Sequence, residues 1–292
     1  MASWQAHLAV WVIKWRVKRR LRGVRDYRVA RKILNPDPYK VPADVRISSA
    51  QVGGVLGEWV EGTGSANAVL LYLHGGGYTT MSPRTHRSLT SRLAAWSNAR
   101  LFALDYRLSP EHPFPAAVDD AVAAYRALVA TGIAASRIVV AGDSAGGGLA
   151  LALLISSRDA GDPLPVAAVL FSPWTDLAAT GKSIVENDAS DPLFFGSWVA
   201  RQGRHYLGNT LSTHPLASPV YADLTGLPPL LIQVSDSEVL LDDSRRVAEK
   251  AERSSLRIWH GVPHGWQIFA PILPEGRDAL REAAEFIRAA LA

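Results

Sequence analysis

The sequence predicts an α/β fold in which a mostly parallel β-sheet carries helices on both faces. The first observation is that short, continuously apolar runs alternate with longer helical segments, as buried parallel strands and their crossover helices do. The second is the composition: 48% of the 292 residues are hydrophobic and 20% are charged, which is enough to build a large core. This length suits one large domain or two smaller ones.

The strands are expected from their apolar runs and the helices from the segments between them. Two short segments on either side of Gly53 and Gly54, residues 45–48 and 55–60, predict an antiparallel pair. The later runs predict buried parallel strands: Val69–Leu73, Leu101–Leu104, Ile138–Ala141, Val166–Phe171, Leu230–Val234 and Leu256–Trp259. The predicted helices are Arg87–Trp96, Ala116–Ala130, Ala145–Arg158, Asp242–Arg253 and Glu275–Ala290.

One interval breaks this alternation. Between Phe171 and Leu230 there is no clear strand, although the segment contains several aromatic residues. A structureless loop of this length is uncommon in a compact domain, so we expect a small helical insertion over the sheet.

The N-terminal segment is a basic arm with its own apolar pattern. Residues 1–32 contain ten Lys or Arg and one Asp, a net charge of +9, which leaves −5 on the rest of a chain whose overall charge is +4. Leu8, Trp11, Val12 and Trp15 recur at helical spacing. We expect this Trp stripe to pack on the body while the charges stay solvated. The alternative is a helix that lies on anionic lipid, which would make peripheral membrane contact.

The arm does not have the features of a membrane span or a secretory signal. Its apolar stretch, Leu8–Ile13, is shorter than the roughly 20 residues that cross a bilayer, and its basic residues follow that stretch instead of preceding it. We therefore expect a cytoplasmic protein, with membrane association through the arm left open. No nucleic-acid partner is expected, because no recognised module accompanies the charge.

The segment 142–146 reads Gly-Asp-Ser-Ala-Gly and lies between a predicted strand and a predicted helix. This is the context in which Gly-x-Ser-x-Gly presents a nucleophilic serine on a sharp turn, here Ser144, at the positive end of a helix. The chain has no cysteine, which excludes disulfides, zinc–thiolate sites and a thiol nucleophile.

A glycine-rich loop follows the predicted strand Val69–Leu73. Residues 74–77 read His-Gly-Gly-Gly, so backbone amides are exposed without side chains over them, as an oxyanion hole requires. A phosphate loop is not favoured, because neither of the usual nucleotide-binding patterns is present.

A serine nucleophile needs a base and an orienting acid. His264 stands in a loop after the last predicted strand. This position fits the chain order Ser, acid, His that accompanies a Gly-x-Ser-x-Gly serine. The acid then comes from the end of the strand before it, where Asp236 and Glu238 are both available.

With these motifs in place, the chain resembles the bacterial esterases of the hormone-sensitive lipase family, which have the α/β-hydrolase fold with a helical cap. The matching blocks are residues 74–78, 105–117, 142–147, 172–176 and 264–266. The resemblance implies hydrolysis of esters with short to medium acyl chains, without metal or organic cofactor. It implies Ser144 as nucleophile and His264 as base, and an oxyanion hole from Gly76, Gly77 and Ala145 that Gly75 shapes.

The family resemblance also implies a domain organisation. Residues 1–40 would be N-terminal cap helices, and residues 41–292 the catalytic domain, with a cap insertion at about 177–215. The expected partner is a small ester. The sequence does not decide whether the chain forms a homodimer.

The sequence departs from the family at the acid. Where the family has Asp-Pro-Leu-x-Asp-Glu, residues 238–243 read Glu-Val-Leu-Leu-Asp-Asp, which aligns Glu238 with the family's aspartate and makes it the favoured acid over Asp236. Asp143 is either a supporting group or a turn former. The pocket candidates, for which ordinary packing is an equal alternative, are Tyr78, Trp174, Trp198 and Trp266.

Two other functions stay open. The nearer is an amide or formamide hydrolase that uses the same residues, because the pocket and not the triad selects the leaving group. The more distant is a non-catalytic ligand-binding member of the fold.

Overall fold

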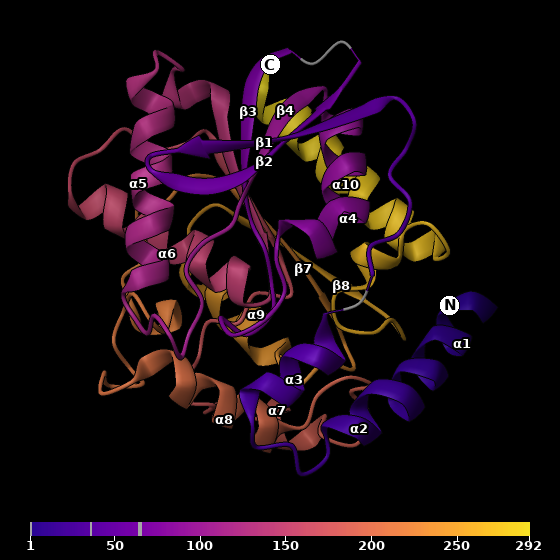
Figure 1. Cartoon of the computed structure of the whole chain (residues 1–292). Helices are drawn as coiled ribbons and strands as arrows, with labels where there is room; N and C mark the ends of the chain where they lie inside the picture. Colours follow the sequence, from indigo (N-terminus) through magenta and orange to yellow (C-terminus); the bar gives the residue numbers. More distant parts are fainter. Residues whose placement is uncertain (1, 36, 64–65) are drawn as a thin grey trace.

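The computed structural model describes residues 2–35, 37–63 and 66–292, and these form an eight-stranded sheet with helices on both faces (Figure 1). The strands are β1 (Val45–Val52), β2 (Val55–Gly62), β3 (Ala66–Leu73), β4 (Ala99–Leu104), β5 (Ile138–Asp143), β6 (Ala167–Phe171), β7 (Leu230–Ser235) and β8 (Ser254–Trp259). Their order is β1-β2-β4-β3-β5-β6-β7-β8, and only the pairs β1–β2 and β2–β4 are antiparallel. The predicted α/β fold and its antiparallel first pair are confirmed.

The helices follow the predicted segments closely. They are α1 (Trp4–Ile13), α2 (Arg19–Leu21), α3 (Tyr27–Leu34), α4 (Pro83–Ser97), α5 (Ala116–Ala130), α6 (Ala145–Asp159), α7 (Ser183–Glu186), α8 (Gly196–Leu207), α9 (Leu241–Lys250) and α10 (Pro274–Leu291). A π-helical turn, η1 (Lys14–Lys18), joins α1 to α2, and short 3₁₀ turns are η2 (Ala135–Arg137), η3 (Pro219–Tyr221) and η4 (Trp266–Phe269). The predicted helix Asp242–Arg253 ends earlier, at Lys250, because β8 begins at Ser254.

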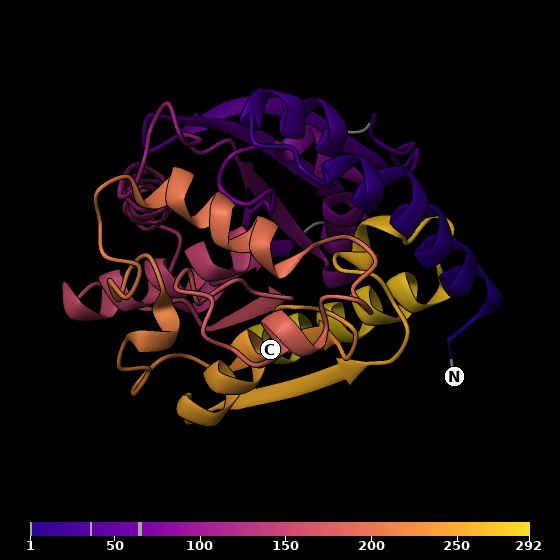
Figure 2. The ribbon, with the colours of Figure 1, turned by 90° about the horizontal axis from the view of Figure 1, so that it is seen from below.

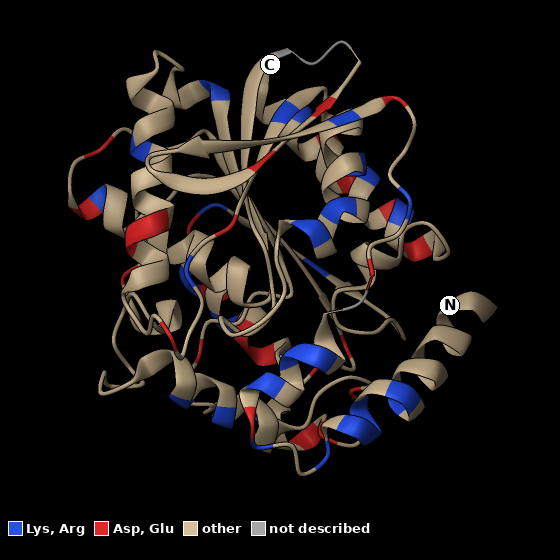
Figure 3. Ribbon diagram, viewed as in Figure 1, with Lys and Arg blue, Asp and Glu red and all other residues tan. Residues whose placement is uncertain are grey.

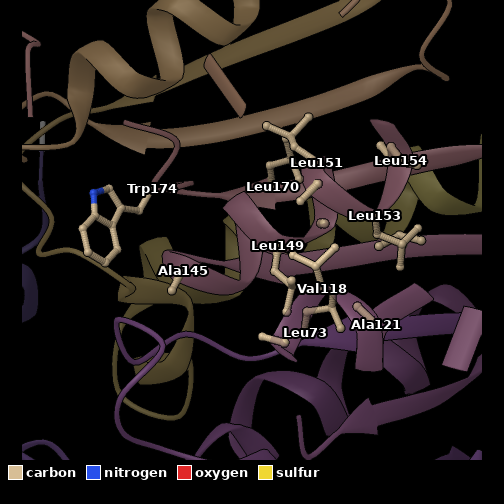
Figure 4. Packing of buried hydrophobic residues seen from close by; sticks show 14 of the residues in the cluster. Leu73, Val118, Ala121, Ala145, Leu149, Leu151, Leu153, Leu154, Leu170 and Trp174 are labelled. Atoms are coloured by element: carbon tan, nitrogen blue, oxygen red, sulfur yellow. The ribbon is translucent and has the colours of Figure 1, made fainter. Parts of the chain in front are cut away.

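Alternate residues of the central strands are buried against the two helical layers. In β3, Leu71 belongs to the core formed with α5 and α6, whereas Leu70 belongs to the core formed with α4 and α10. Figure 4 shows Leu149 of α6 and Val118 of α5 within the first of these layers, near Leu73. Both faces of the sheet are therefore covered, which accounts for the continuously apolar strands.

The strand register decides where the loops meet. β3 pairs with β5 so that Leu73 lies opposite Gly142, and β5 pairs with β6 so that Asp143 lies opposite Phe171. β7 and β8 end together, with Ser235 opposite Trp259. The loops that follow β3, β5, β6, β7 and β8 therefore emerge at the same edge of the sheet, which is where ligands bind in open α/β folds.

The N-terminal arm lies along the segment that joins β6 to β7. The views in Figures 1 and 2 place the later part of the arm beside α8, the longer helix of that segment. The Lys18 ammonium donates hydrogen bonds to the carbonyl oxygens of Asp188 (2.5 Å) and Asp191 (2.7 Å), and Arg201 donates to the carbonyl of Val24 (2.7 Å). Two segments far apart in the sequence therefore share one contact surface.

The Trp stripe does not pack on the body, and that expectation is wrong. Of its residues, Leu8, Trp11 and Trp15 are 51%, 63% and 56% exposed and Val12 is half-buried, while Trp4, one turn before Leu8, is 71% exposed. The buried side chains of α1, η1 and α2 are instead Ala6, Ile13, Lys18 and Leu21.

The physical reason is that α1 is apolar on almost every side, so the stripe was not the only surface it could bury. The small side chain of Ala6 lets α1 lie close to the body, where it packs in a cluster with Val262 and Trp266. Beyond α1, Lys18 hydrogen-bonds to the Asp191 carbonyl and Leu21 packs in the main core. No helix in the three ranges that the structure describes is both long enough and apolar enough to cross a bilayer.

Candidate active site

Ser144 occupies the turn between β5 and α6 in a strained backbone conformation. Its φ of 53° and ψ of −122° lie outside the regions that non-glycine residues normally adopt. The turn is held by hydrogen bonds from the Ser144 amide to the Phe171 carbonyl (2.8 Å) and from the Trp174 amide to the Ser144 carbonyl (2.9 Å). A side chain at Gly146 would meet the Leu73 carbonyl at 2.0 Å, so the motif needs glycine there. Ser144 therefore stands at the N-terminus of α6.

The glycine-rich loop after β3 is fastened to the same turn. The Gly75 amide donates to the Asp143 carboxylate (2.8 Å), and a Cβ on Gly75 would lie only 2.2 Å from that carboxylate. Within the described residues, the amides of Gly76, Gly77 and Ala145 donate to no protein acceptor. Gly75 thus anchors the loop to the turn, and the three predicted donors have N–H groups without a protein acceptor.

Asp143 lies at the centre of a buried hydrogen-bond network. It accepts from the Tyr72 hydroxyl (2.7 Å) and contacts the His86 Nε2 (3.2 Å) as well as the Gly75 amide. Burial opposes its charge, but His86 and Tyr72 outweigh burial and lower the pKa of Asp143 to about 2. Burial likewise opposes a charged His86, and the Asp143 carboxylate overcomes it and raises the pKa of His86.

The role of this network was not evident from the sequence. The sequence leaves Asp143 as either a supporting group or a turn former, while Tyr72 is one residue of an apolar run and His86 one of several histidines in helical or linker segments. The structure makes Asp143 the group that holds the glycine-rich loop against the serine turn.

Glu238 and His264 form a buried pair. The His264 Nδ1 donates to the Glu238 carboxylate over 2.5 Å, and both side chains are almost inaccessible to solvent. Burial by itself would lower the pKa of His264, but the adjacent Glu238 carboxylate outweighs it and raises this pKa above its ordinary value. Because Nδ1 carries the bonded proton, Nε2 is the nitrogen that can accept one.

The carboxylate of Glu238 is itself held in place. It accepts from the Ser172 hydroxyl (2.7 Å) and the Ser235 amide (2.9 Å). Asp236, the other candidate, is 41% exposed and bonds instead to the His260 ring (2.7 Å) on the surface. Of the two acids, the structure places Glu238 and not Asp236 against His264.

Aromatic side chains of the segment after β6 contact His264 and two of the pocket candidates. Phe194, from the segment after β6, meets the His264 ring edge-on with the centroids 5.1 Å apart, and Trp198 stacks on Phe194 at 4.8 Å. Tyr78 stacks on Tyr206 at 3.7 Å.

The remaining pocket candidates occupy different places. Trp174 is almost completely buried and lies 6.0 Å from Tyr78, measured between ring centroids. Trp266 is completely buried in the separate cluster beneath the arm, where it packs with Ala6 and Leu273. The expectation that Trp266 lines the substrate pocket is therefore corrected: it packs the core.

The described groups make acyl-transfer chemistry feasible. A serine on a strained turn, a histidine paired with a carboxylate, and free backbone amides all follow strands that end at one edge of the sheet. These correspond to a nucleophile, a general base and an oxyanion-binding group.

Known proteins are similar to this chain in both sequence and fold. Residues 70–268 match the model of the alpha/beta hydrolase fold family. The chain is 47% identical over 253 residues to an acetyl-hydrolase from Streptomyces hygroscopicus, an alignment that covers 85% of this chain and 83% of that protein. It is 36% identical over 247 residues to an esterase from Acinetobacter venetianus, with 83% and 82% covered.

Solved structures agree with these matches. A crystal structure of an esterase from the bacterial hormone-sensitive lipase family superposes with a TM-score of 0.93 at 42% identity and covers all of both chains. EstE5, from crystals soaked with p-nitrophenyl butyrate, gives a TM-score of 0.95 at 40% identity over 99% of each chain. The fold and these relatives define an enzyme that hydrolyses carboxylic esters. Within that class, the chain belongs to the bacterial hormone-sensitive lipase family of the α/β-hydrolase fold.

Proposed function

We propose that this enzyme hydrolyses esters with short to medium acyl chains through a covalent acyl-enzyme on Ser144. The observation that carries the proposal is the buried Glu238–His264 hydrogen bond at the sheet edge where Ser144 stands. A histidine held by a carboxylate is the base that a serine hydroxyl requires.

The reaction would run in two halves. Ser144 attacks the ester carbonyl while His264 Nε2 takes its proton, and the amides of Gly76, Gly77 and Ala145 stabilise the oxyanion. His264 then gives the proton to the leaving alcohol. Water repeats the cycle on the acyl-enzyme, which releases the acid and restores Ser144.

The acyl range is supported by the relatives. One relative is an acetyl-hydrolase, and crystals of another were soaked with p-nitrophenyl butyrate. For this chain we propose short esters as substrates, with a cap formed by residues 1–40 and the insertion at about 177–215. The contact of Phe194 with His264, and the stacking of Trp198 on Phe194, support a role for the insertion in forming the acyl pocket.

The serine is tested with Ser144→Ala and p-nitrophenyl butyrate. Because the nucleophile is lost while the fold around the turn is kept, kcat should fall by on the order of 10⁴-fold or more. A fluorophosphonate probe should label the wild-type protein on Ser144 and leave the variant unlabelled.

Two outcomes would contradict the proposal: esterase activity retained in the variant, or labelling at a residue other than Ser144. Matched ester and anilide substrates with the same acyl group distinguish an esterase from an amide hydrolase. We expect hydrolysis of the ester to be much faster.

A further inference from the structure

The outer side of the N-terminal arm carries an apolar stripe that no part of the protein covers among the described residues. The stripe consists of Trp4, Leu8, Trp11 and Trp15, each more than half exposed. Their spacing of four, three and four residues puts them on one side of α1 and its continuation into η1. The Trp11 and Trp15 rings stack in parallel with their centroids 6.4 Å apart, which forms a flat apolar surface.

The arm cannot hide this stripe by turning about its axis. The opposite side is fixed by Ala6 and Ile13 in the core and by the two hydrogen bonds of the buried Lys18. At its start, the amide and hydroxyl of Ser3 both donate to the Glu275 carboxylate of α10. The exposure of the stripe is therefore a consequence of how the arm is held.

Exposed cations adjoin the stripe. Figure 3 shows Lys and Arg concentrated along the later turns of the arm, after the apolar start of α1. The exposed members are Lys14, Arg16, Arg19, Arg20, Arg22, Arg25, Arg28 and Lys32. Exposed Trp residues beside a dense cationic segment complement an anionic lipid surface, which offers an apolar interior beneath negative headgroups.

We propose that the arm is an interfacial anchor that docks the enzyme on anionic membranes. Trp4, Leu8, Trp11 and Trp15 enter the headgroup region, and the arginines that follow contact the lipid phosphates. The rest of the arm stays bound to α8 and to the loop before it, as in the structure. The proposal does not depend on the catalytic roles of Ser144, Glu238 and His264.

Vesicle flotation of the full chain tests the anchor. We compare vesicles of equal parts phosphatidylcholine and phosphatidylglycerol with vesicles of phosphatidylcholine alone, at low and high salt. We expect flotation with the anionic vesicles, and weaker flotation at high salt because screening reduces the electrostatic part of the binding free energy.

The double variant Trp11→Ser/Trp15→Ser should partition into the anionic vesicles at least roughly tenfold more weakly than the wild type. Arg19→Gln/Arg20→Gln should lose about fivefold for each charge removed.

A matched control replaces two exposed apolar residues outside the arm. Leu56 and Leu211 are 57% and 77% exposed, and the double variant Leu56→Ser/Leu211→Ser should float like the wild type. Each variant is also checked for an unchanged circular dichroism spectrum and an unchanged Tm, which shows that the fold is intact.

Three results would overturn the proposal. The first is failure of the wild type to float, and the second is equal partition of the wild type and the Trp double variant. The third is a dimer in sedimentation that Trp11→Ser/Trp15→Ser converts to a monomer, without flotation. In that case the stripe is a contact between two copies.

Discussion

At the scale of single residues, the reactivity of the site depends on which carboxylate faces the His264 imidazole. Glu238 is buried and held by Ser172 and Ser235, so its charge acts on the ring with little solvent screening. Asp236 is partly exposed and bonded to His260, where its charge is screened. Burial and orientation, and not the residue type, distinguish the two acids.

This difference predicts the pH dependence of the reaction. His264 must be neutral to accept a proton, so kcat/KM should rise with pH through the raised pKa of His264. Glu238→Gln removes the charge that raises this pKa, so the rise should move to lower pH. The same change should reduce kcat by on the order of 10⁴-fold, because the imidazolium formed during the reaction loses its partner.

Asp236→Asn is the matched control, since it removes one carboxylate at almost the same position in the chain. It should leave both kcat and the position of the pH profile close to those of the wild type. Collapse of kcat in Asp236→Asn, with Glu238→Gln active, would reverse the assignment of the acid.

At the scale of elements, the arm is fastened to the insertion chiefly through the π-helical turn η1. Lys18 is buried, and its ammonium reaches two carbonyl oxygens and lies 4.4 Å from the centroid of the Phe195 ring. Burial outweighs the nearby acids and lowers the pKa of Lys18. Asp191, whose carbonyl accepts from Lys18, also accepts the Val239 amide next to Glu238 through its carboxylate (3.0 Å). The arm is thus linked to the loop that holds the acid.

Lys18→Met should loosen the arm without unfolding the body. The carbonyls of Asp188 and Asp191 would lose their donor inside the protein, at a cost of about 1–3 kcal/mol. Chymotrypsin should therefore cleave the arm roughly tenfold faster, because cleavage follows the population of the opened arm.

Lys14→Met provides the comparison. Lys14 is exposed and makes a single hydrogen bond to the Ala189 carbonyl (3.1 Å), so its removal should change the cleavage rate little. Equal protection of the arm in Lys18→Met and in the wild type would show that Lys18 does not fasten it.

At the scale of the whole molecule, the arm connects two regions on either side of the proposed site. Arg31 donates to the carbonyls of Thr79 (2.5 Å) and Ser109 (3.1 Å) near the glycine-rich loop, and pairs with Glu111. Lys18 binds the insertion. Leu21 and Leu34 are buried in the main core. The arm is therefore part of the folded body and not an appended tail.

Deletion of residues 1–35 should alter both stability and substrate range. Loss of the buried Leu21 and Leu34 and of the polar contacts should lower Tm by at least about 5 °C, as measured by differential scanning calorimetry. If the arm is half of the proposed cap, the ratio of butyrate to octanoate hydrolysis should also change. An unchanged ratio in a folded, fluorophosphonate-reactive deletion variant would exclude the arm from the acyl pocket.

The parts of the fold and of the candidate site that depend on neighbouring residues could be predicted from the sequence, whereas the parts that depend on distant residues could not. The apolar runs that became β3–β8, the turn at Ser144 and the glycine-rich loop at 74–77 were all readable, because each depends on residues adjacent in the chain. The alignment of residues 238–243 with the family's acidic segment favoured Glu238. Only the packed structure separates its surroundings from those of Asp236.

The sequence by itself determined the succession of strands and helices along the chain, the positions of the turns and the chemical groups that follow them. The tertiary structure alone decided which side of the arm is buried, that Trp266 packs the core, and that Tyr72 and His86 meet Asp143. The reason is that local backbone preferences and hydrophobic periodicity act over a few residues. Burial and the pKa of a side chain depend instead on neighbours that the fold brings together from distant parts of the chain.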